Sequence, residues 1–126
     1  MAIFANVKSA IAASIKILTA VDRFNVLRQS KKEDPVFIGL SINTGPVILG
    51  PVGDEKRMSG TVIGNAVNVG SRMVSLTKMY GVRMITSKIA IEKMVNKELK
   101  GVASPFVFRE LDRVKVAVTI LGILII

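Results

Sequence analysis

Apolar residues recur every three or four positions along the first quarter of the chain. Between residues 5 and 29 their successive spacings are four, four, three, three, three and three. Such spacing places side chains on one face of an α-helix, because a helix completes a turn in about 3.6 residues. The pattern therefore predicts a helix over residues 5–29 with an apolar face made of Val7, Ile11, Ile15, Leu18, Val21, Phe24 and Leu27.

Alternation replaces this period after a polar stretch that ends at Pro35, which disfavours helix at the residue before it. Residues 36–43 alternate in the manner of a strand with one buried face. Asn65 is the predicted N-cap of a second helix that reaches about Tyr80. Between them the pattern predicts a turn at 44–46, a short strand at 47–49, an exposed hairpin tip at 50–57 and a strand end at 61–64.

The last third of the chain predicts a strand at 82–85 and a helix that is capped by Thr86 or Ser87 and reaches about Asn96. Two more strands are expected, over 106–111 and from 114 onward. Residues 116–126 are uncharged but fall short of the roughly 20 residues that a membrane-spanning helix needs, so they read as a strand or an apolar tail. The pattern as a whole predicts an α+β fold with helices packed on a sheet.

Length and composition fit one folded domain. The chain has 126 residues, half of them apolar, which suits a single hydrophobic core. Cysteine and histidine are both absent, which excludes disulfide frameworks, thiol nucleophiles, histidine acid–base chemistry and zinc sites of the usual kind. The first residues lack the basic flank and long apolar core of a signal peptide, so a cytoplasmic location is expected.

The chain is strongly basic, with 18 Lys and Arg against nine Asp and Glu and a net charge of +9. Nucleic acid is a natural partner to consider for such a protein. The cations are spread along the chain without a run longer than two, and there is one Tyr and no Trp, so a base-stacking platform is not expected. A basic protein that binds an anionic surface through charge alone remains an open alternative.

Candidate chemistry centres on the helix predicted after residue 64. Asn68 and Arg72 are four residues apart, so both project from one face, one turn apart. The guanidinium fork suits phosphate oxygens, and the amide can bond a ribose or phosphate group. Gly64 before the helix would let the backbone N–H groups of its first turn approach an anion. In the alternative without a binding role, Arg72 is a solvated helix residue and the side chain of Asn68 forms hydrogen bonds with the nearby backbone.

Several linked segments between residues 36 and 88 carry a family resemblance. They read INTGPVILG, GPVGDEKRM, TVIGNAVNVGSRM and SLTKMYGVRMITS. In this order and spacing they closely resemble the class III nucleotidyl cyclase catalytic domain of adenylate and guanylate cyclases, and FRELDRVKV, over 106–116, resembles its closing strands more weakly. The resemblance implies a ferredoxin-like α+β fold with an antiparallel sheet. Residues 1–126 would form the C-terminal part of that domain, with its N-terminal part missing.

The resemblance also assigns roles. Asn68 falls on the asparagine that orients the ribose, and Arg72 on the arginine that stabilises the phosphorus when the 3′-hydroxyl attacks the α-phosphate. Thr61 falls on a purine-selecting position and favours ATP over GTP. Lys115 falls on or beside a triphosphate-binding lysine. The implied reaction converts ATP to 3′,5′-cyclic AMP and diphosphate in intracellular signalling.

Metal binding is where the chain departs from the family. Members hold two Mg²⁺ or Mn²⁺ ions with aspartates from strands that precede the region covered here, and Asp54 and Glu55 read as a solvated hairpin tip. The chain alone is therefore expected to be inactive. The expected partners are ATP and a second copy or a complementary cyclase segment, in the cytoplasm or on the cytoplasmic side of a membrane protein. The alternative is a degenerate cyclase-like module that dimerises or regulates without catalysis.

Overall fold

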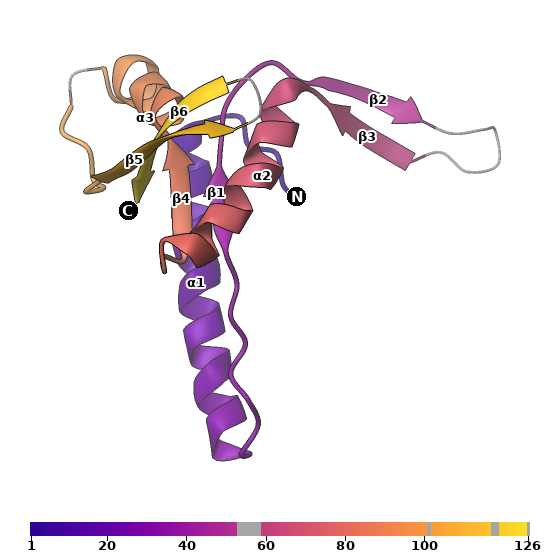
Figure 1. Cartoon of the computed structure of the whole chain (residues 1–126), viewed down its shortest axis with the longest axis vertical. Helices are drawn as coiled ribbons and strands as arrows, with labels where there is room; N and C mark the ends of the chain where they lie inside the picture. The colour runs from indigo at the N-terminus through magenta and orange to yellow at the C-terminus, as the bar shows by residue number, and fades with distance from the viewer. Residues whose placement is uncertain (53–58, 101, 117–118, 126) are drawn as a thin grey trace.

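Helices and strands follow one another nearly as the sequence pattern predicts (Figure 1). The computed structural model describes residues 1–52, 59–100, 102–116 and 119–125. Residues 59–63 form a strand of their own rather than a strand end. In chain order the elements are α1 (Val7–Ser30), β1 (Leu40–Ile42), β2 (Ile48–Val52), β3 (Ser59–Ile63), α2 (Asn65–Met79), β4 (Met84–Ser87), α3 (Lys88–Lys93), the π-helix η1 (Met94–Leu99), β5 (Arg109–Val116) and β6 (Thr119–Ile125).

Four strands form the central sheet, in the order β1-β4-β6-β5. The pairs β4–β6 and β5–β6 are antiparallel, as expected, whereas β1 and β4 run parallel, with Leu40 opposite Met84. The parallel pair arises because the chain crosses from β1 to β4 through α2, and parallel neighbours need such a crossover. Strands β2 and β3 form a separate antiparallel hairpin that projects away from the sheet in Figure 1.

The C-terminal residues form an inner strand of this sheet. β6 pairs with β5 from Thr119 opposite Val116 to Ile125 opposite Arg109, and with β4 on its other side. The predicted strand is thus confirmed, and the alternative of a loose apolar tail is not. The predicted boundaries, 106–111 and from 114 onward, are wrong by several residues because no turn residue interrupts the sequence inside Arg109–Val116.

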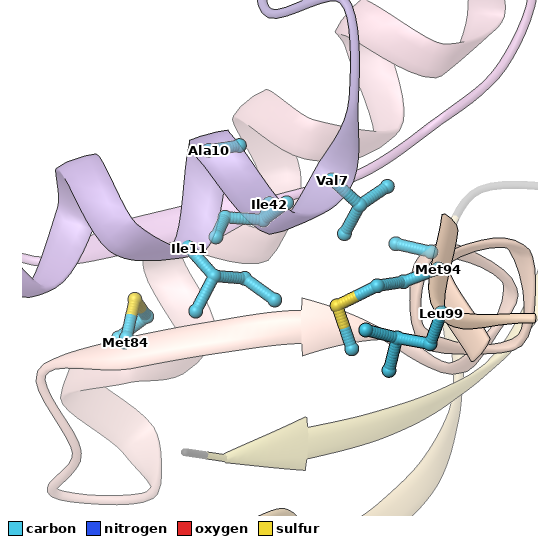
Figure 2. Packing of buried hydrophobic residues seen from close by; sticks show 8 residues of the cluster. Val7, Ala10, Ile11, Ile42, Met84, Met94 and Leu99 are labelled. Carbon is cyan, nitrogen blue, oxygen red and sulfur yellow. The ribbon is translucent and has the colours of Figure 1, made fainter. Parts of the chain in front are cut away.

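Two apolar clusters cover opposite faces of the sheet, and β4 contributes to both. Met84 packs with the residues of α1, α3 and η1, whereas its neighbour Ile85 packs with Val69 and Met73 of α2. Successive residues of a strand point to opposite faces, so α1 and α3 lie on one side of the sheet and α2 on the other. Figure 2 shows the first cluster, with Ile11 of α1 above Met84 and with Met94 and Leu99 of η1 at its end.

Only the first half of α1 meets this core. Its buried residues are Val7, Ala10, Ile11 and Ser14, and its second half extends beyond the sheet in Figure 1. Ile15, Phe24 and Leu27 are exposed, so the predicted apolar face is confirmed at Val7 and Ile11 and in part at Leu18, which packs against the core. Among the described residues, no helix combines the length and apolar character needed to cross a membrane.

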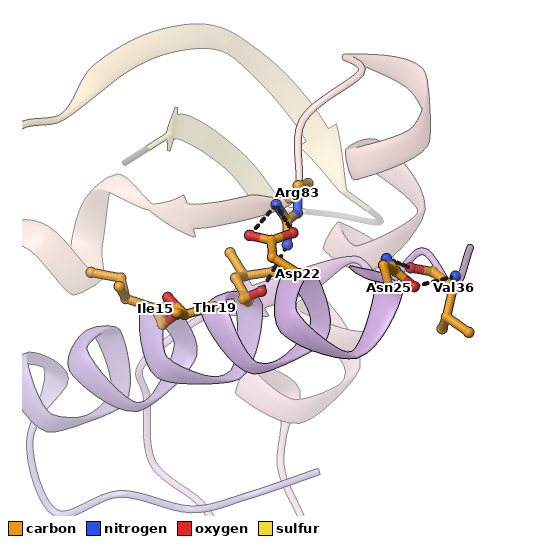
Figure 3. Close-up of polar contacts among 7 residues, drawn as sticks. Ile15, Thr19, Asp22, Asn25, Val36 and Arg83 are labelled. Atoms are coloured by element: carbon orange, nitrogen blue, oxygen red, sulfur yellow. Dashed lines mark hydrogen bonds and ion pairs between the residues drawn. The ribbon is translucent and has the colours of Figure 1, made fainter. Parts of the chain in front are cut away.

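Polar contacts hold the second half of α1 in place (Figure 3). Asn25 donates to the carbonyl of Val36 and accepts from its N–H, both at 2.8 Å. Arg83 forms a 2.9 Å ion pair with Asp22 and donates to the carbonyl of Leu18 at 3.0 Å. Asn25 occupies both backbone groups of Val36, and β4 pairs only with Leu40–Ile42, so the predicted strand over 36–43 is limited to these three residues.

Candidate functional site

The β3–α2 junction positions the candidate site. Gly64, not the predicted Asn65, is the N-cap of α2, and no side chain caps the helix there. A Cβ atom on Gly64 would lie 2.7 Å from the carbonyl oxygen of Pro46, closer than such atoms approach. The glycine therefore allows close contact between the start of α2 and the backbone of Pro46, which precedes the hairpin.

Asn68 and Arg72 lie one turn apart on α2, and both are exposed. Val69 and Met73, the residues that follow each of them, are buried against the sheet. Because these buried neighbours fix the rotation of the helix, the amide and the guanidinium are held on the side of α2 that faces away from the core. The arrangement presents one neutral and one charged donor group to solvent.

A cavity in the described part of the chain lies on a different side of the same helix. Its volume is about 790 Å³, and α2 contributes Ala66, Val67, Gly70, Ser71 and Val74 to its wall. Asn68 and Arg72 are not among the lining residues. Asn68 and Arg72 therefore do not face this cavity.

The other two candidates come from separate strands. Thr61 lies in β3, opposite Gly50 of the projecting hairpin, three residues before Gly64. Lys115 is exposed and lies in β5, the edge strand farthest from β1, opposite Ile120 of β6. Thr61 therefore lies close in sequence to the start of α2, in the separate hairpin, whereas Lys115 lies on an edge strand of the central sheet.

The carboxylates near these elements are used for structure. Asp112 accepts a 2.7 Å hydrogen bond from the Tyr80 hydroxyl, which lowers the pKa of its carboxyl below the ordinary value of 3.8. Asp22 pairs with Arg83, and Glu98 accepts bonds from the backbone of α1. Asp54 and Glu55 lie outside the described residues.

These carboxylates do not make a metal site. Within the described ranges, no group of three Asp, Glu, His or Cys side chains is placed to hold an ion. Carboxylate oxygens are the ligands that Mg²⁺ prefers, so the described part of the chain does not fit the metal ions that the family resemblance implies.

Two features of the site region escaped the sequence analysis. One is the cavity beside β1, whose lining includes Ala10 and Ser14 of α1 and Lys93 at the end of α3. The other is Glu98, which bonds to the first turn of α1 across 91 residues. Small residues four apart on a helix, such as Ala10 and Ser14, are a sequence signal for close packing of that face. The contact of Glu98 has no local signal.

Comparison with known proteins agrees with the resemblance carried by residues 36–88. The family model for the adenylate and guanylate cyclase catalytic domain matches residues 2–120. An adenylate cyclase of Anabaena cylindrica is 36% identical over 100 residues, covering 75% of this chain and 20% of that protein. The terminal-differentiation specific adenylate cyclase of Dictyostelium discoideum is 33% identical over 108 residues, covering 86% of this chain and 5% of that protein.

A solved structure agrees as well. The structure of a bacterial light-regulated adenylyl cyclase superimposes with a TM-score of 0.51 and 25% identity, over 69% of this chain and 22% of that chain. The chain thus spans about a fifth or less of the length of these relatives. The helix-on-sheet fold and the family resemblance are both confirmed, and the chain belongs to the adenylate and guanylate cyclase catalytic domain family.

Proposed function

We propose that this chain is part of an adenylate cyclase domain that converts ATP to 3′,5′-cyclic AMP and diphosphate once another segment or chain supplies metal-binding carboxylates. The observation that carries the proposal is the position of Asn68 and Arg72, exposed one turn apart on α2 in a member of the cyclase family. The relatives named adenylate cyclase support ATP as the substrate.

The chemistry asked of the two residues is positioning and charge stabilisation. Arg72 would form charge-assisted hydrogen bonds to the α-phosphate and stabilise the negative charge that builds there when the 3′-hydroxyl attacks. Asn68 would bond the ribose and hold that hydroxyl in line. Phosphoryl transfer depends mainly on such placement. Thr61 would contact the purine, and Lys115 the triphosphate.

The exposure of both donors argues for a site shared between molecules. Charged hydrogen bonds gain strength where water is excluded, and one copy of the chain leaves Arg72 exposed. A second copy or a complementary cyclase segment would cover that face of α2. Mg²⁺ or Mn²⁺ would need carboxylates from outside the described residues, so the residues named here have only the tasks of binding and orienting the nucleotide. With ATP as substrate, the domain would act in the cytoplasm or on the cytoplasmic side of a membrane protein.

Nucleotide binding tests the proposal directly. ATP is titrated calorimetrically at fixed salt into the chain and into Arg72→Ala, with Arg23→Ala, which removes an exposed arginine of α1, as the matched control. We expect Arg72→Ala to weaken binding by about 1.5–3 kcal/mol, the range for a hydrogen bond to a charged group, and Arg23→Ala to change it little. Equal losses would mean that ATP senses only the net charge of +9, and the proposal would fail.

A module without catalysis is the second candidate, and one observation favours it: the described residues offer no carboxylate cluster for metal ions. Such a module would associate with a partner but would bind ATP no more tightly than inorganic triphosphate at the same salt. The calorimetric titration therefore separates the two candidates.

A further inference from the structure

Strand β1 meets α2 through polar and small residues. The apolar cluster on this face of the sheet holds α2 against β4 and β5, and among the described residues none of its members belongs to β1. β1 instead presents Ser41 to the helix, and Asn43 follows on the same side two residues later, because side chains alternate along an extended chain. The contact between β1 and α2 therefore depends on hydrogen bonds and close approach rather than on apolar packing.

Two hydrogen bonds make this contact. The Ser41 hydroxyl donates to the carbonyl of Gly70 at 2.6 Å, and the Asn43 amide donates to the carbonyl of Ala66 at 2.9 Å. The two acceptors are four residues apart, so they lie one turn apart on the same side of α2. We call Ser41, Asn43, Ala66 and Gly70 the polar seam. It fastens two successive turns of the helix to β1 and to the residue that follows it.

Close approach beside the seam leaves little room for α2 to shift. A Cβ atom on Gly45 would lie 2.7 Å from the Cβ of Ala66, and one on Gly39 would collide with the hydroxyl of Thr77. Both contacts would be closer than such atoms approach, so the glycines allow the chain to lie directly against the helix. The segment from Gly39 to Gly45 thus follows α2 from its last turn to its first.

The seam lies opposite the candidate site on the helix. Ala66 precedes Asn68 by two positions, and Gly70 precedes Arg72 by two positions. Two positions correspond to a turn of about 200° around the axis, at about 3.6 residues per turn, so Asn68 and Arg72 project from the side away from the seam. A rotation of α2 at the seam would therefore move both donors together.

The seam constrains this rotation more closely than the apolar cluster does. The buried residues Val69 and Met73 determine which side of α2 faces the sheet, but apolar attraction has no preferred direction. Hydrogen bonds hold their partners within a narrow range of distance and angle. No side chain caps the start of α2, so the bond from Asn43 to Ala66 supplies a directional contact in the first turn.

We propose that Ser41 and Asn43 are positioning residues of the nucleotide site: through the polar seam they set the rotation of α2 and so direct Asn68 and Arg72 toward the ribose and the phosphates. This role rests on the proposed function, which assigns those two donors to ATP. Ser41 and Asn43 bond to the backbone of α2 and act only through the helix. Loss of the seam should displace both donors, because they belong to one rigid element.

Two double variants provide a matched comparison. The seam variant, Ser41→Ala with Asn43→Leu, removes both donors of the seam. The control variant, Ser14→Ala with Asn25→Leu, also removes one hydroxyl and one amide that donate to backbone carbonyls, but these lie in and beside α1. Thermal unfolding establishes that each variant is folded and how much stability each has lost.

The first measurement contains no nucleotide. The chain has no cysteine, so Arg72→Cys and Glu92→Cys, at exposed positions of α2 and α3, can carry two spin labels whose separation is measured by pulsed electron resonance. A rotation of about 30° moves a group at the helix surface, about 5–6 Å from the axis, by about 3 Å. We expect the seam variant to shift or broaden the distance distribution by about this amount, and the control variant to match the native chain.

The second measurement is ATP affinity, by calorimetry at fixed salt. The seam variant should bind ATP about tenfold more weakly than the native chain, because a displaced Arg72 loses its charge-assisted bonds. The control variant should change the affinity less than about twofold, within the scatter of independent sites. Adding Arg72→Ala to the seam variant should cost little further affinity, whereas the same change in the native chain costs its full factor.

A conservative pair keeps the test decisive if the seam variant does not fold. Ser41→Thr and Ser41→Val have nearly the same shape, and only threonine keeps the hydroxyl. We expect threonine to retain the native affinity for ATP and valine to weaken it by about threefold or more, since one neutral hydrogen bond is lost. Equal affinities of these two folded variants would overturn the proposal.

The two measurements separate this proposal from the proposed function. An unchanged label distance in the seam variant would overturn the positioning role, and so would an undiminished effect of Arg72→Ala in that variant. Equal losses of ATP affinity in the seam and control variants would also overturn it. If the native chain binds ATP no better than Arg72→Ala while the label distance still shifts, the proposed function and the nucleotide role fail, and only the anchoring of α2 stands.

Discussion

The carboxylate of Glu98 accepts a 2.8 Å hydrogen bond from the backbone N–H of Val7, the first residue of α1. Its second oxygen accepts from the N–H of Lys8, also at 2.8 Å. The first N–H groups of a helix have no partner within the helix and carry its positive dipole end. Glu98 of η1 thus provides hydrogen-bond acceptors for the first turn of α1, which is 91 residues away in sequence, and links these two elements of the core.

Replacing Glu98 by Ala should destabilise the fold by about 1.5–3 kcal/mol, the range for hydrogen bonds to a charged group. Glu98→Gln should lose less, because the amide still offers one acceptor. Urea unfolding measures both, with Glu92→Gln, at an exposed position of α3, as the control. Equal midpoints for Glu98→Ala and the native chain would contradict this account of the contact.

The Tyr80–Asp112 contact predicts a pH dependence at both extremes. The hydrogen bond from Tyr80, with a second from the N–H of Arg113, lowers the pKa of Asp112, so its contribution to stability is present above 3.8 and is lost as pH falls through the lowered value. The same bond to Asp112 raises the pKa of Tyr80, so the contribution is present below 10.0 and is lost as pH rises through the raised value.

Tyr80→Phe should therefore remove the change at high pH and reduce the change at low pH, because the N–H of Arg113 still donates to Asp112. The measurement is Tm against pH for the two proteins, and the difference between the curves should be largest near neutral pH and shrink toward both ends. The contact lies at the surface, so the difference is expected to be small. Equal Tm values for the two proteins at every pH would show that packing of the ring, which phenylalanine keeps, and not the hydrogen bond, stabilises the contact with β5.

The chain by itself, given ATP with Mg²⁺ or Mn²⁺, should make no cyclic AMP above background. The expectation follows from the described residues, which hold no carboxylate cluster that could clamp metal ions. The assay measures cyclic AMP over long incubations at high protein concentration. Product that disappears in Arg72→Ala would contradict the prediction and would show that carboxylates of this chain suffice.

We also expect a dimer or a larger species at micromolar concentration. The β2–β3 hairpin exposes apolar side chains, with Ile48 72% and Ile63 56% exposed at paired positions, and exposed apolar patches favour association. Light scattering should give a mass above 13.6 kDa, and Ile48→Ser should lower it. A native chain that remains monomeric would count against association through this hairpin.

Regular helices and their spacing were predictable from the sequence because they depend on local periodicity. Helix α2 and the placement of Asn68 and Arg72 one turn apart follow from residues within a few positions of each other. The limits of the first helix were predictable too, but the exposure of Phe24 was not, because it depends on how far the sheet extends along α1. The start of α2 at Gly64 depends on the carbonyl of Pro46 in another turn.

Long-range contacts explain the other differences. The parallel pairing of β1 with β4 depends on the crossover through α2, and the short length of β1 depends on the three residues that β4 pairs with it. From the sequence alone, Arg83 looks like an ordinary surface arginine. In the structure it forms an ion pair with Asp22, so substituting it would disturb α1 as well as remove a charge. For this reason Arg23 serves as the control for Arg72.

The inner position of β6 determines when the fold can form during synthesis. β4 and β5 have no direct pairing and are joined through β6, which is the last of these strands to leave the ribosome. Domains synthesised from the N-terminus fold as their contacts become available. Until residues 119–125 emerge, the growing chain can pair β1 with β4 and β2 with β3, but it exposes the edge of β4. Among these stages, the nascent chain is therefore most vulnerable to misassociation in the interval just before β6 is made.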